Sequence, residues 1–426
     1  MNAIELKAKL MNGELLERLT YLYVDEAMIA MQTQRYLAAI DKFVELYGAA
    51  REIAIYSAPG RSEVGGNHTD HQHGRVLAAS VNLDTIAIVA KSEESNVRIT
   101  SQGFNIKPVD ISDLHMREEE AGSSEGLIRG VHARIVELGF QIGGFDAYMT
   151  SNVLEGAGLS SSAAFEVLLG TMISDMFNEG KIDSVEIAKI GQYAENKYFL
   201  KPCGLMDQCA SSVGGFVTID FENPEAPVVE KMKFDLATYK HSLCIIDTKG
   251  SHADLTQDYA DITKEMKSVA HYFKKEYLRE VSCDEFIKEI SNVRETCGDR
   301  SVLRAYHFFE EDERVVQEVE ALRNCDFVRF KQLVIASGNS SYKFLQNVYS
   351  PQNLNEQNIS IALALSEYAL RDRGASRVHG GGFAGTIQAF VPDELLTSYK
   401  ELMEATFGKD SCYVLKIRPC GGVRVI

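Results

Sequence analysis

The chain has 426 residues, 45% hydrophobic and 25% charged, a composition typical of soluble globular proteins with two or more domains. Its formal charge of −17, from 44 Lys and Arg against 61 Asp and Glu residues, argues against a general nucleic-acid binder. No stretch approaches the ~18–20 apolar residues of a membrane-spanning helix, and residues 1–10 lack the basic and apolar regions of a signal peptide. We therefore expect neither nucleic acid nor a membrane among its partners.

The eight cysteines are scattered, and no pair has the C-x-x-C spacing of a zinc or redox site. A chain of this size does not depend on disulfides for its stability, so we interpret these cysteines as reduced thiols. This interpretation predicts a cytoplasmic protein.

Along the chain, residues 1–50 have the apolar spacing of helices, and the period then changes to that of strands. In the first half we predict a helix at 161–177 and strands at 52–57 (ending at Pro59-Gly60), 76–91, 97–101, 146–151 and 216–220. In the second half we predict mostly helix over 255–335, and strands at 241–247, 386–390 and 412–417. This mixture indicates an α/β or α+β protein, with a domain boundary near residues 225–240.

A Gly- and Ser-rich segment at residues 156–164 follows a predicted strand and opens a predicted helix. Small residues allow a ligand to approach the backbone, and the free N–H groups at a helix start favour an anion. Phosphate binding and a simple Ser-rich helix cap both remain open on this evidence. The chain has no G-x-x-x-x-G-K-[ST] sequence, so the segment is not a Walker-type loop.

Residues 380–385 satisfy G-x-G-x-x-G, but a strand pattern follows, where a dinucleotide-binding motif requires a helix. A loop packed against a bulky group, or a plain tight turn, explains this segment better.

Residues 58–74 form the third glycine-rich segment, which is dense in polar groups. His68, His71 and His73 with Asp70 could hold a metal, although their spacing defines no metal geometry. A loop that binds a polyhydroxyl compound next to Arg61, or a polar turn with solvated histidines, are the other interpretations.

Taken together and in this order, these segments resemble the motifs of the GHMP small-molecule kinases, and within them the galactokinases. The galactokinase signature G-R-x-N-L-x-G-E-H-T-D-Y-N-x-G corresponds to residues 60–74, and G-L-S-S-S-A is intact at 158–163. The third motif, G-G-G-F-G-G, corresponds to residues 380–385, where Ala384 replaces one glycine, and C-G-x-M-D-Q resembles residues 203–208. The matches extend from residue 50 to the C-terminus.

The resemblance implies an α+β fold with two domains, an N-terminal domain like domain 2 of ribosomal protein S5 and a ferredoxin-like C-terminal domain. We place them at residues 36–235 and 236–426, after a helical extension at 1–35 that has no counterpart in the family. ATP and sugar would meet in the cleft between the domains. Because the family is often monomeric, we expect a monomer or a weak homo-oligomer.

The resemblance also assigns a nucleotide site and a metal. The second motif would hold the phosphates of ATP through Gly156, Gly158, Leu159, Ser160, Ser161 and Ser162. Mg²⁺ prefers oxygen ligands, and its protein ligands would be Glu195 and Ser162, or the neighbouring Ser161. Without the resemblance, Glu195 would be interpreted as an exposed helix carboxylate.

For catalysis, Asp207 matches the family's catalytic carboxylate and would accept the proton of the sugar's anomeric hydroxyl. Arg61 would keep Asp207 ionised and stabilise the charge of the transferred phosphoryl group. Late proton transfer is the version we prefer, because proton transfer from a hydroxyl to a carboxylate is uphill.

The sugar-contacting positions of the family correspond to Asn67, His68, Asp70, Gly204 and Tyr259, the last on the weakest match. Asn67 stands where the family has Glu, and Glu63 stands where it has Asn; His71-Gln72 replaces Tyr-Asn. An amide donates as well as accepts, whereas a carboxylate only accepts, so these departures bear on the identity of the sugar.

The predicted function is therefore ATP-dependent phosphorylation of the anomeric hydroxyl of galactose. The alternatives are N-acetylgalactosamine, galacturonate or another modified galactose as the substrate, and then a mevalonate- or homoserine-type kinase. A non-catalytic sugar sensor is less consistent with the complete second motif and with the presence of Arg61 and Asp207. A zinc protein built on the histidine cluster is the last alternative.

Overall fold

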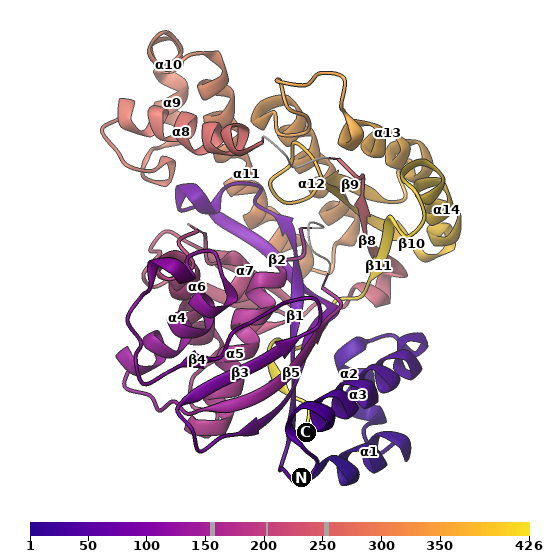
Figure 1. The fold of residues 1–426 in the computed structure, drawn as a ribbon. Coiled ribbons are helices and arrows are strands. Elements are labelled where there is room, and N and C mark those ends of the chain that lie inside the picture. Colours follow the sequence, from indigo (N-terminus) through magenta and orange to yellow (C-terminus); the bar gives the residue numbers. More distant parts are fainter. Residues whose placement is uncertain (154–157, 202, 251–254) are drawn as a thin grey trace.

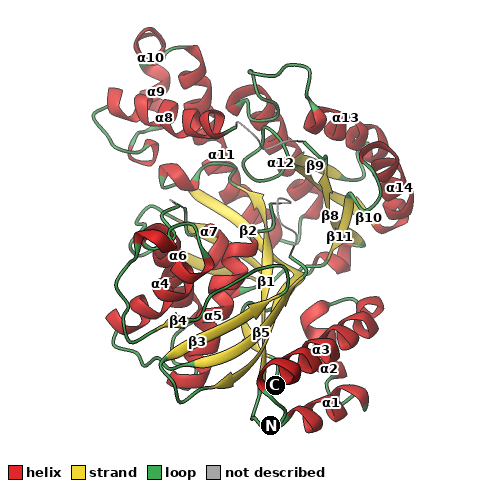
Figure 2. Ribbon diagram, viewed as in Figure 1, coloured by secondary structure: helices red, strands yellow, loops and turns green. Residues whose placement is uncertain are grey.

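The computed structural model describes residues 1–153, 158–201, 203–250 and 255–426. Helices and strands alternate through the chain, and the strands form two sheets, as Figures 1 and 2 show. Long helices cover both sheets. The fold is therefore α+β, as the sequence predicts.

Three helices at the N-terminus pack on one face of the larger sheet; they are α1 (Ala3–Met11), α2 (Leu16–Tyr23) and α3 (Glu26–Tyr47). Their buried apolar residues form a core with Ile55, Ile86 and Ile88 of the sheet. Asp84, fully buried on that sheet, accepts hydrogen bonds from Tyr23 (2.8 Å), Arg35 (2.6 Å) and Arg418 (3.2 Å). This network joins the N-terminal helices, the sheet and the C-terminal segment.

The larger sheet has eight strands within the described residues. They are β1 (Ala54–Gly65), β2 (Arg75–Lys91), β3 (Asn96–Ser101), β4 (Val109–Asp110), β5 (Phe145–Ser151), β6 (Phe216–Asp220), β7 (Val228–Met232) and β12 (Val423–Arg424). The order is β12-β1-β2-β5-β3-β4, while β6 pairs with β2 and β7. The pairs are antiparallel except β3 with β5.

Four helices pack against the larger sheet and against one another; they are α4 (Ser124–Glu137), α5 (Ser161–Asn178), α6 (Ser184–Lys197) and α7 (Met206–Val213). Apolar residues of α4, α5 and α6 form a core with those of β1, β2 and β5. This packing fixes the start of α5 and of α7 beside β1, which is where the functional residues gather.

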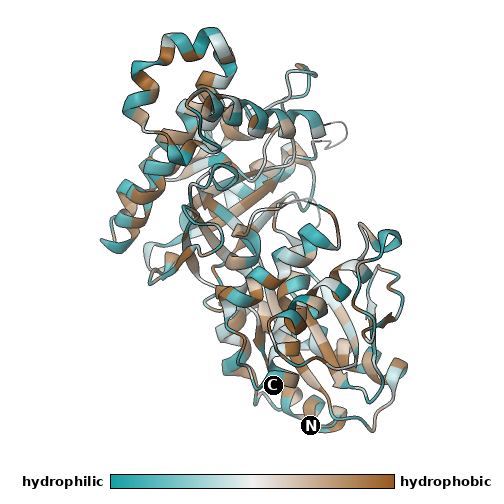
Figure 3. Cartoon of the chain, turned by 90° about the vertical axis from the view of Figure 1, so that its left-hand side faces the viewer, coloured by the Kyte–Doolittle hydropathy of each residue, from teal (hydrophilic) through white to brown (hydrophobic). Residues whose placement is uncertain are grey.

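The smaller sheet is antiparallel and has the order β11-β8-β10-β9, from β8 (His241–Asp247), β9 (Ala375–Val378), β10 (Thr386–Pro392) and β11 (Cys412–Leu415). The helices of this half are α8 (Thr256–Tyr272), α9 (Cys283–Lys288), α10 (Ile290–Cys297), α11 (Asp299–Arg323), α12 (Phe327–Ser340), α13 (Asn358–Leu370) and α14 (Leu396–Phe407). In Figure 3 the peripheral helices are banded in teal and brown, as expected of helices with one buried face.

One sequence expectation was wrong: the first strand does not end at Pro59-Gly60 but continues as β1 to Gly65. The pairing of β1 with β2 shifts register between Pro59 and Arg61, so the proline and glycine lie at an irregularity inside the strand. Gly60 is required there, because a Cβ would lie 2.8 Å from the Leu159 carbonyl oxygen. The strand therefore carries Arg61 and Glu63 into the interior.

The domain bounds at residues 35 and 235 stay a prediction. α3 runs without a break from Glu26 to Tyr47, and β12 returns from the end of the sequence to pair with β1. Among the described residues, no helix is long and apolar enough to span a membrane.

Candidate active site

Arg61 and Asp207 form an ion pair where the two halves of the molecule meet. Arg61 lies in β1 and Asp207 in the first turn of α7; the Arg61 guanidinium donates through Nε to Asp207 Oδ1 at 2.6 Å and through Nη2 to Asp207 Oδ2. Its Nη1 donates to the Gly158 carbonyl oxygen. The three interactions give Arg61 a single orientation.

Burial would raise the pKa of Asp207, but the charge and hydrogen bonds of Arg61, with a hydrogen bond from Ser160, hold it below its ordinary value. Asp207 is therefore a carboxylate at neutral pH. A carboxylate with an adjacent guanidinium can accept a proton and can also stabilise negative charge that develops beside it.

A cavity of about 500 Å³, here called the larger cavity, opens on one side of this pair. Gly158 and Ser160, Ser161 and Ser162 line it at the start of α5, whose first N–H groups have no partner within the helix. Leu159 does not line it: its side chain is fully buried in the core, and its carbonyl oxygen accepts from the Arg61 N–H at 3.0 Å. Gly156 lies outside the described residues.

Glu195 of α6 also lines the larger cavity, together with Lys201. One oxygen of Glu195 accepts from Lys201 Nζ at 3.2 Å and the other from Gln208 Nε2 at 2.9 Å. Glu195 is 3% exposed, so it is not the exposed helix carboxylate that its sequence context alone suggests. The structure thus brings a buried carboxylate, an ammonium group and the serine hydroxyls to one cavity.

A second cavity of about 230 Å³, the smaller cavity, opens on the other side of the ion pair. Both cavities are lined by Arg61, Cys203, Asp207, Gly380 and Gly381. The remaining lining of the smaller cavity is Glu63, His68, Asp70, His71, Gly204 and Met206. The ion pair therefore lies at the junction of two adjoining cavities.

His68 and Asp70 present hydrogen-bond acceptors in the smaller cavity. His68 has φ of 60° and places Nε2 3.0 Å from the Gly381 carbonyl oxygen, which can only accept. Nε2 therefore carries the proton and Nδ1 is the acceptor; burial and nearby His71 lower the pKa of His68 to about 4, so it is neutral at pH 7. Asp70 lies against Gly204, where a Cβ would be 2.5 Å from the Asp70 carboxylate.

Asn67 and Tyr259 lie elsewhere. Asn67 is fully buried beneath the smaller cavity and does not line it. Tyr259 lines the larger cavity, not the smaller one, and its hydroxyl donates to the Gly382 carbonyl oxygen at 2.9 Å. Its ring contacts Phe383 edge to face and lies where a Cβ at Gly381 would clash at 2.6 Å, so residues 380–385 are a loop packed against a bulky group.

The zinc interpretation finds no support in the described part of the chain, where no group of three His, Cys, Asp or Glu residues is arranged to hold a metal ion. The ring of His73 is stacked on Tyr277, with centroids 3.6 Å apart. His73 therefore lies apart from His68 and His71, which both line the smaller cavity and have ring centroids 6.1 Å apart.

Comparison with known proteins places the chain in a family. The galactokinase galactose-binding signature matches residues 41–91, and the GHMP kinases N terminal domain matches residues 126–215. Galactokinase of Actinobacillus pleuropneumoniae serotype 3 is 30% identical over 378 residues, which cover 88% of this chain and 94% of that protein. The chain belongs to the galactokinase family.

Other galactokinases agree with this assignment. The enzyme of Clostridium tetani is 28% identical over 86% of this chain and 91% of its own length. The structure of Lactococcus lactis galactokinase complexed with galactose has a TM-score of 0.77 at 22% identity, covering 91% of this chain and 100% of that one. A mevalonate kinase has a TM-score of 0.61 at 14% identity, so the fold is that of the GHMP kinases.

Sequence reasoning missed several lining residues of this galactokinase family member. Lys201 lies two residues before the C-G-x-M-D-Q match at 203–208, so its position was a signal that could have been used. His379 hydrogen-bonds Ser62 and Thr386 at 3.1 Å each; burial and the charge of Arg61 lower its pKa to about 3. His379 directly precedes the glycine-rich segment at 380–385, which is a sequence signal, whereas its contact with Ser62 joins positions more than 300 residues apart and could not be expected from the sequence.

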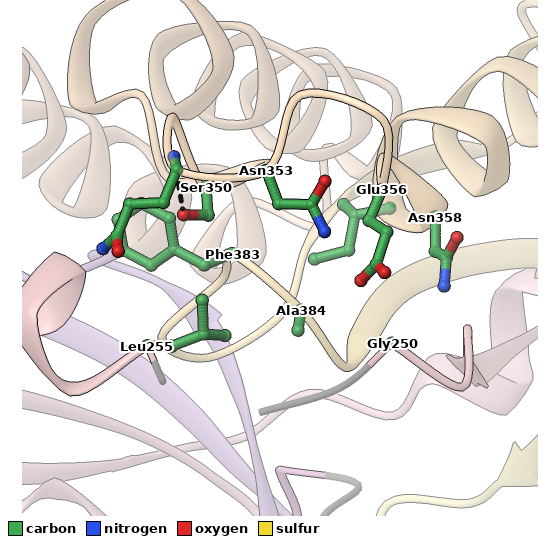
Figure 4. A pocket seen from close by; sticks show the side chains of 10 residues that line it. Gly250, Leu255, Ser350, Asn353, Glu356, Asn358, Phe383 and Ala384 are labelled. Carbon is green, nitrogen blue, oxygen red and sulfur yellow. Dashed lines mark hydrogen bonds between the residues drawn. The ribbon is translucent and has the colours of Figure 1, made fainter. Parts of the chain in front are cut away.

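A further cavity of about 380 Å³ lies beyond Ala384, which also lines the larger cavity. Figure 4 shows polar side chains on one side of it, among them Asn353 and Glu356, and Leu255 and Ala384 on the other. Among the described residues that line it, Phe383 and Ala384 belong to the third motif, but none is a residue that the sequence assigns to catalysis, sugar, ATP or Mg²⁺.

Proposed function

We propose that this galactokinase family member transfers the terminal phosphoryl group of ATP to the anomeric hydroxyl of galactose. The observation that carries the proposal is the position of Asp207 and Arg61 at the junction of two cavities of different chemistry. The volume of the larger cavity and the helix that starts in it suit a nucleoside triphosphate. The size and the polar lining of the smaller cavity suit one sugar molecule.

In the larger cavity, the phosphates would lie against Gly158 and the N–H groups and hydroxyls of Ser160, Ser161 and Ser162. Leu159 would contribute only through its backbone, because its side chain is buried in the core. Lys201 and the start of α5 add positive charge to that of Arg61, which also lines this cavity.

Mg²⁺ fits the donor set of the larger cavity. Glu195 supplies a buried carboxylate and Ser161 or Ser162 a hydroxyl, and a magnesium site with few protein ligands keeps several waters. When bound, the ion would neutralise charge on the phosphates during transfer.

At the junction, Asp207 would accept the proton of the anomeric hydroxyl late in the reaction, and Arg61 would stabilise charge on the transferred group. His68, Asp70 and Glu63 would hold the sugar from the far side, with Gly204 leaving room for Asp70. Asn67 and Tyr259 would act indirectly, Asn67 beneath the cavity and Tyr259 by supporting residues 380–382.

The test is a coupled assay of ADP release with ATP, Mg²⁺ and a panel of acceptors that includes galactose, N-acetylgalactosamine, galacturonate, mevalonate and homoserine. We expect galactose-dependent ADP release and an anomeric phosphate ester detectable by ³¹P NMR. The proposal fails if galactose releases no ADP above the background, or if mevalonate or homoserine is the better acceptor.

A further inference from the structure

Asn67 has no hydrogen-bonding capacity left for a substrate. Its Nδ2 donates to Glu63 Oε1 at 2.9 Å and to the Gly380 carbonyl oxygen at 2.7 Å. Its Oδ1 accepts from Asn347 Nδ2 at 2.8 Å and from Ser341 Oγ at 3.3 Å. An amide offers two donor and two acceptor positions, so protein partners occupy all four.

Glu63 lines the smaller cavity, and the two hydrogen bonds that its carboxyl group accepts from described residues use only one of its carboxyl oxygens. It is 5% exposed, and Oε1 accepts hydrogen bonds from Asn67 and from the buried Arg377. Among the described residues no hydrogen bond reaches Oε2, and Oε2 is not one of the fully buried polar atoms that lack a partner. Burial raises the pKa of Glu63 above its ordinary value, and the charge of Arg377 and the hydrogen bond from Asn67 offset this rise only in part.

The position of Glu63 relative to the reacting end is fixed by the strand. Arg61 and Glu63 are two residues apart in a regularly paired part of β1, so their side chains leave the same face about 7 Å apart. That separation is comparable with the width of a hexose ring. A sugar with its anomeric end at Asp207 and Arg61 would therefore present its far end to Glu63.

The lining of the smaller cavity is rich in hydrogen-bond acceptors. Among the described residues, Asp70, Asp207 and Glu63 line it with carboxyl groups and His68 and His71 with imidazole rings, and the one guanidinium, that of Arg61, already donates to Asp207 and Gly158. Hydroxyl groups can donate to such a lining. A carboxylate on the substrate would meet like charge without a free cation.

We propose that Glu63 Oε2, and not Asn67, accepts a hydrogen bond from a hydroxyl at the end of the sugar remote from the transferred phosphoryl group. The smaller cavity then selects neutral sugars and rejects uronic acids. Compared with the family signature, the chain has exchanged Glu and Asn between positions 63 and 67, so the carboxylate has moved from one member of a hydrogen-bonded pair to the other. This inference rests on the proposed function for the placement of the sugar.

The test measures binding by calorimetry without ATP, so that it does not depend on turnover. The ligands are galactose, 2-deoxy-, 4-deoxy- and 6-deoxygalactose, and galacturonate; the proteins are the wild type, Glu63→Gln and Glu120→Gln. Glu120 is the matched control, because it pairs with a buried arginine, Arg129, and lines neither cavity. Thermal melting checks that each variant is folded.

With the wild type and Glu120→Gln, we expect loss of the 4- or the 6-hydroxyl to weaken binding about 10- to 100-fold, the usual effect of a hydrogen bond to a charged group. In Glu63→Gln that penalty should fall below about threefold, while the penalty for 2-deoxygalactose stays the same. Galacturonate should bind the wild type at least about tenfold more weakly than galactose, with a smaller difference in Glu63→Gln.

Equal deoxy-sugar penalties in the wild type and Glu63→Gln would overturn the proposal. If Glu63→Gln fails to fold, the wild type still decides, because galacturonate binding as tightly as galactose contradicts the acceptor lining. The proposal is also overturned if none of these sugars binds to the wild type. A wild type that binds galactose with this pattern but does not phosphorylate it would refute the proposed function and leave the assignment of Glu63 supported.

Discussion

The two cavities that meet at Asp207 are built in different ways. The larger cavity is lined at one end by small residues at a helix start, where backbone N–H groups and serine hydroxyls are the functional groups. The smaller cavity is lined by charged and imidazole side chains, and two of them, Glu63 and His68, are held by residues more than 300 positions away. In the proposed function, the larger cavity would bind its ligand mainly through backbone groups, and the smaller cavity through side chains whose positions depend on their own partners.

This difference suggests how the two sides tolerate change. A backbone site depends mainly on small residues and on the helix that follows. A side-chain site changes its preference when two partners exchange roles, as Glu63 and Asn67 do. Substitutions at the junction of the two cavities, within each cavity and at the margin of the site should therefore have effects of different size. They should also affect different properties: turnover, metal requirement or stability.

The largest effect is expected at the junction. Asp207→Asn should lower kcat/KM for galactose about 10²- to 10⁴-fold, because it removes the proton acceptor. Steady-state kinetics measures the loss. Asp312→Asn is the control, since Asp312 pairs with Arg75 and Arg279 and lines neither cavity; it should lose stability but keep its activity. Equal activity of Asp207→Asn and the wild type would contradict the assigned role.

Arg61→Ala should cost about 10²- to 10³-fold in kcat, the usual effect of losing a donor that stabilises transition-state charge. Because Arg61 and Asp207 act as one unit, the double variant Arg61→Ala/Asp207→Asn should lose far less than the product of the single losses. Kinetics of the three variants gives the coupling. Fully multiplicative losses would mean that the two residues act independently.

A smaller and more specific effect is expected in the larger cavity. Glu195→Gln should raise the Mg²⁺ concentration that gives the half-maximal rate by about 10- to 100-fold or more. Losses of this size are found even when the substituted residue only contacts a metal ligand. A magnesium titration at saturating galactose measures it, and galactose binding without ATP should be unchanged. An unaltered magnesium requirement would exclude Glu195 as a ligand.

The smallest effect concerns stability and pH at His379. Its folded pKa of about 3 lies below the ordinary 6.5, so the unfolded chain binds the proton first and folding stability falls as pH drops below 6.5. The free energy of unfolding of the wild type should therefore fall, relative to that of His379→Gln, by up to about 1.4 kcal/mol for each pH unit below 6.5. Any stability that the substitution costs at pH 7 should shrink accordingly at lower pH. Denaturant unfolding at pH 7, 6 and 5 checks this; a constant difference would contradict it.

The sequence predicts the backbone-built half of the site better than the side-chain half. Residues 158–163 are a continuous motif whose position between a strand and a helix can be recognised locally, and α5 does begin at Ser161. The local pattern could not show that the Leu159 side chain faces the core, because that depends on how α5 packs on β1.

On the other side, Asn67 was predicted to contact the sugar from its place in the signature, and its saturation by Ser341 and Asn347 could not be predicted. These partners lie some 280 positions along the chain and reach Asn67 only after both sheets are packed. The same holds for the continuation of β1 past Gly60, which depends on the register of its partner strand. Local rules describe elements, whereas burial and partners require the assembled fold.

The return of β12 to the edge of β1 has a consequence for biosynthesis. Residues 423–424 pair with Tyr56 and Ser57, so the strand that carries Arg61 gains this neighbour only after residues 423–424 have been synthesised. Arg418, which donates to Ser57 and Asp84, arrives equally late. Domains commonly fold in order during translation, but here the larger sheet is complete only once residues 423–424 have joined it. Expressed as a fragment, the first half would expose an open strand edge and a buried carboxylate short of one cation.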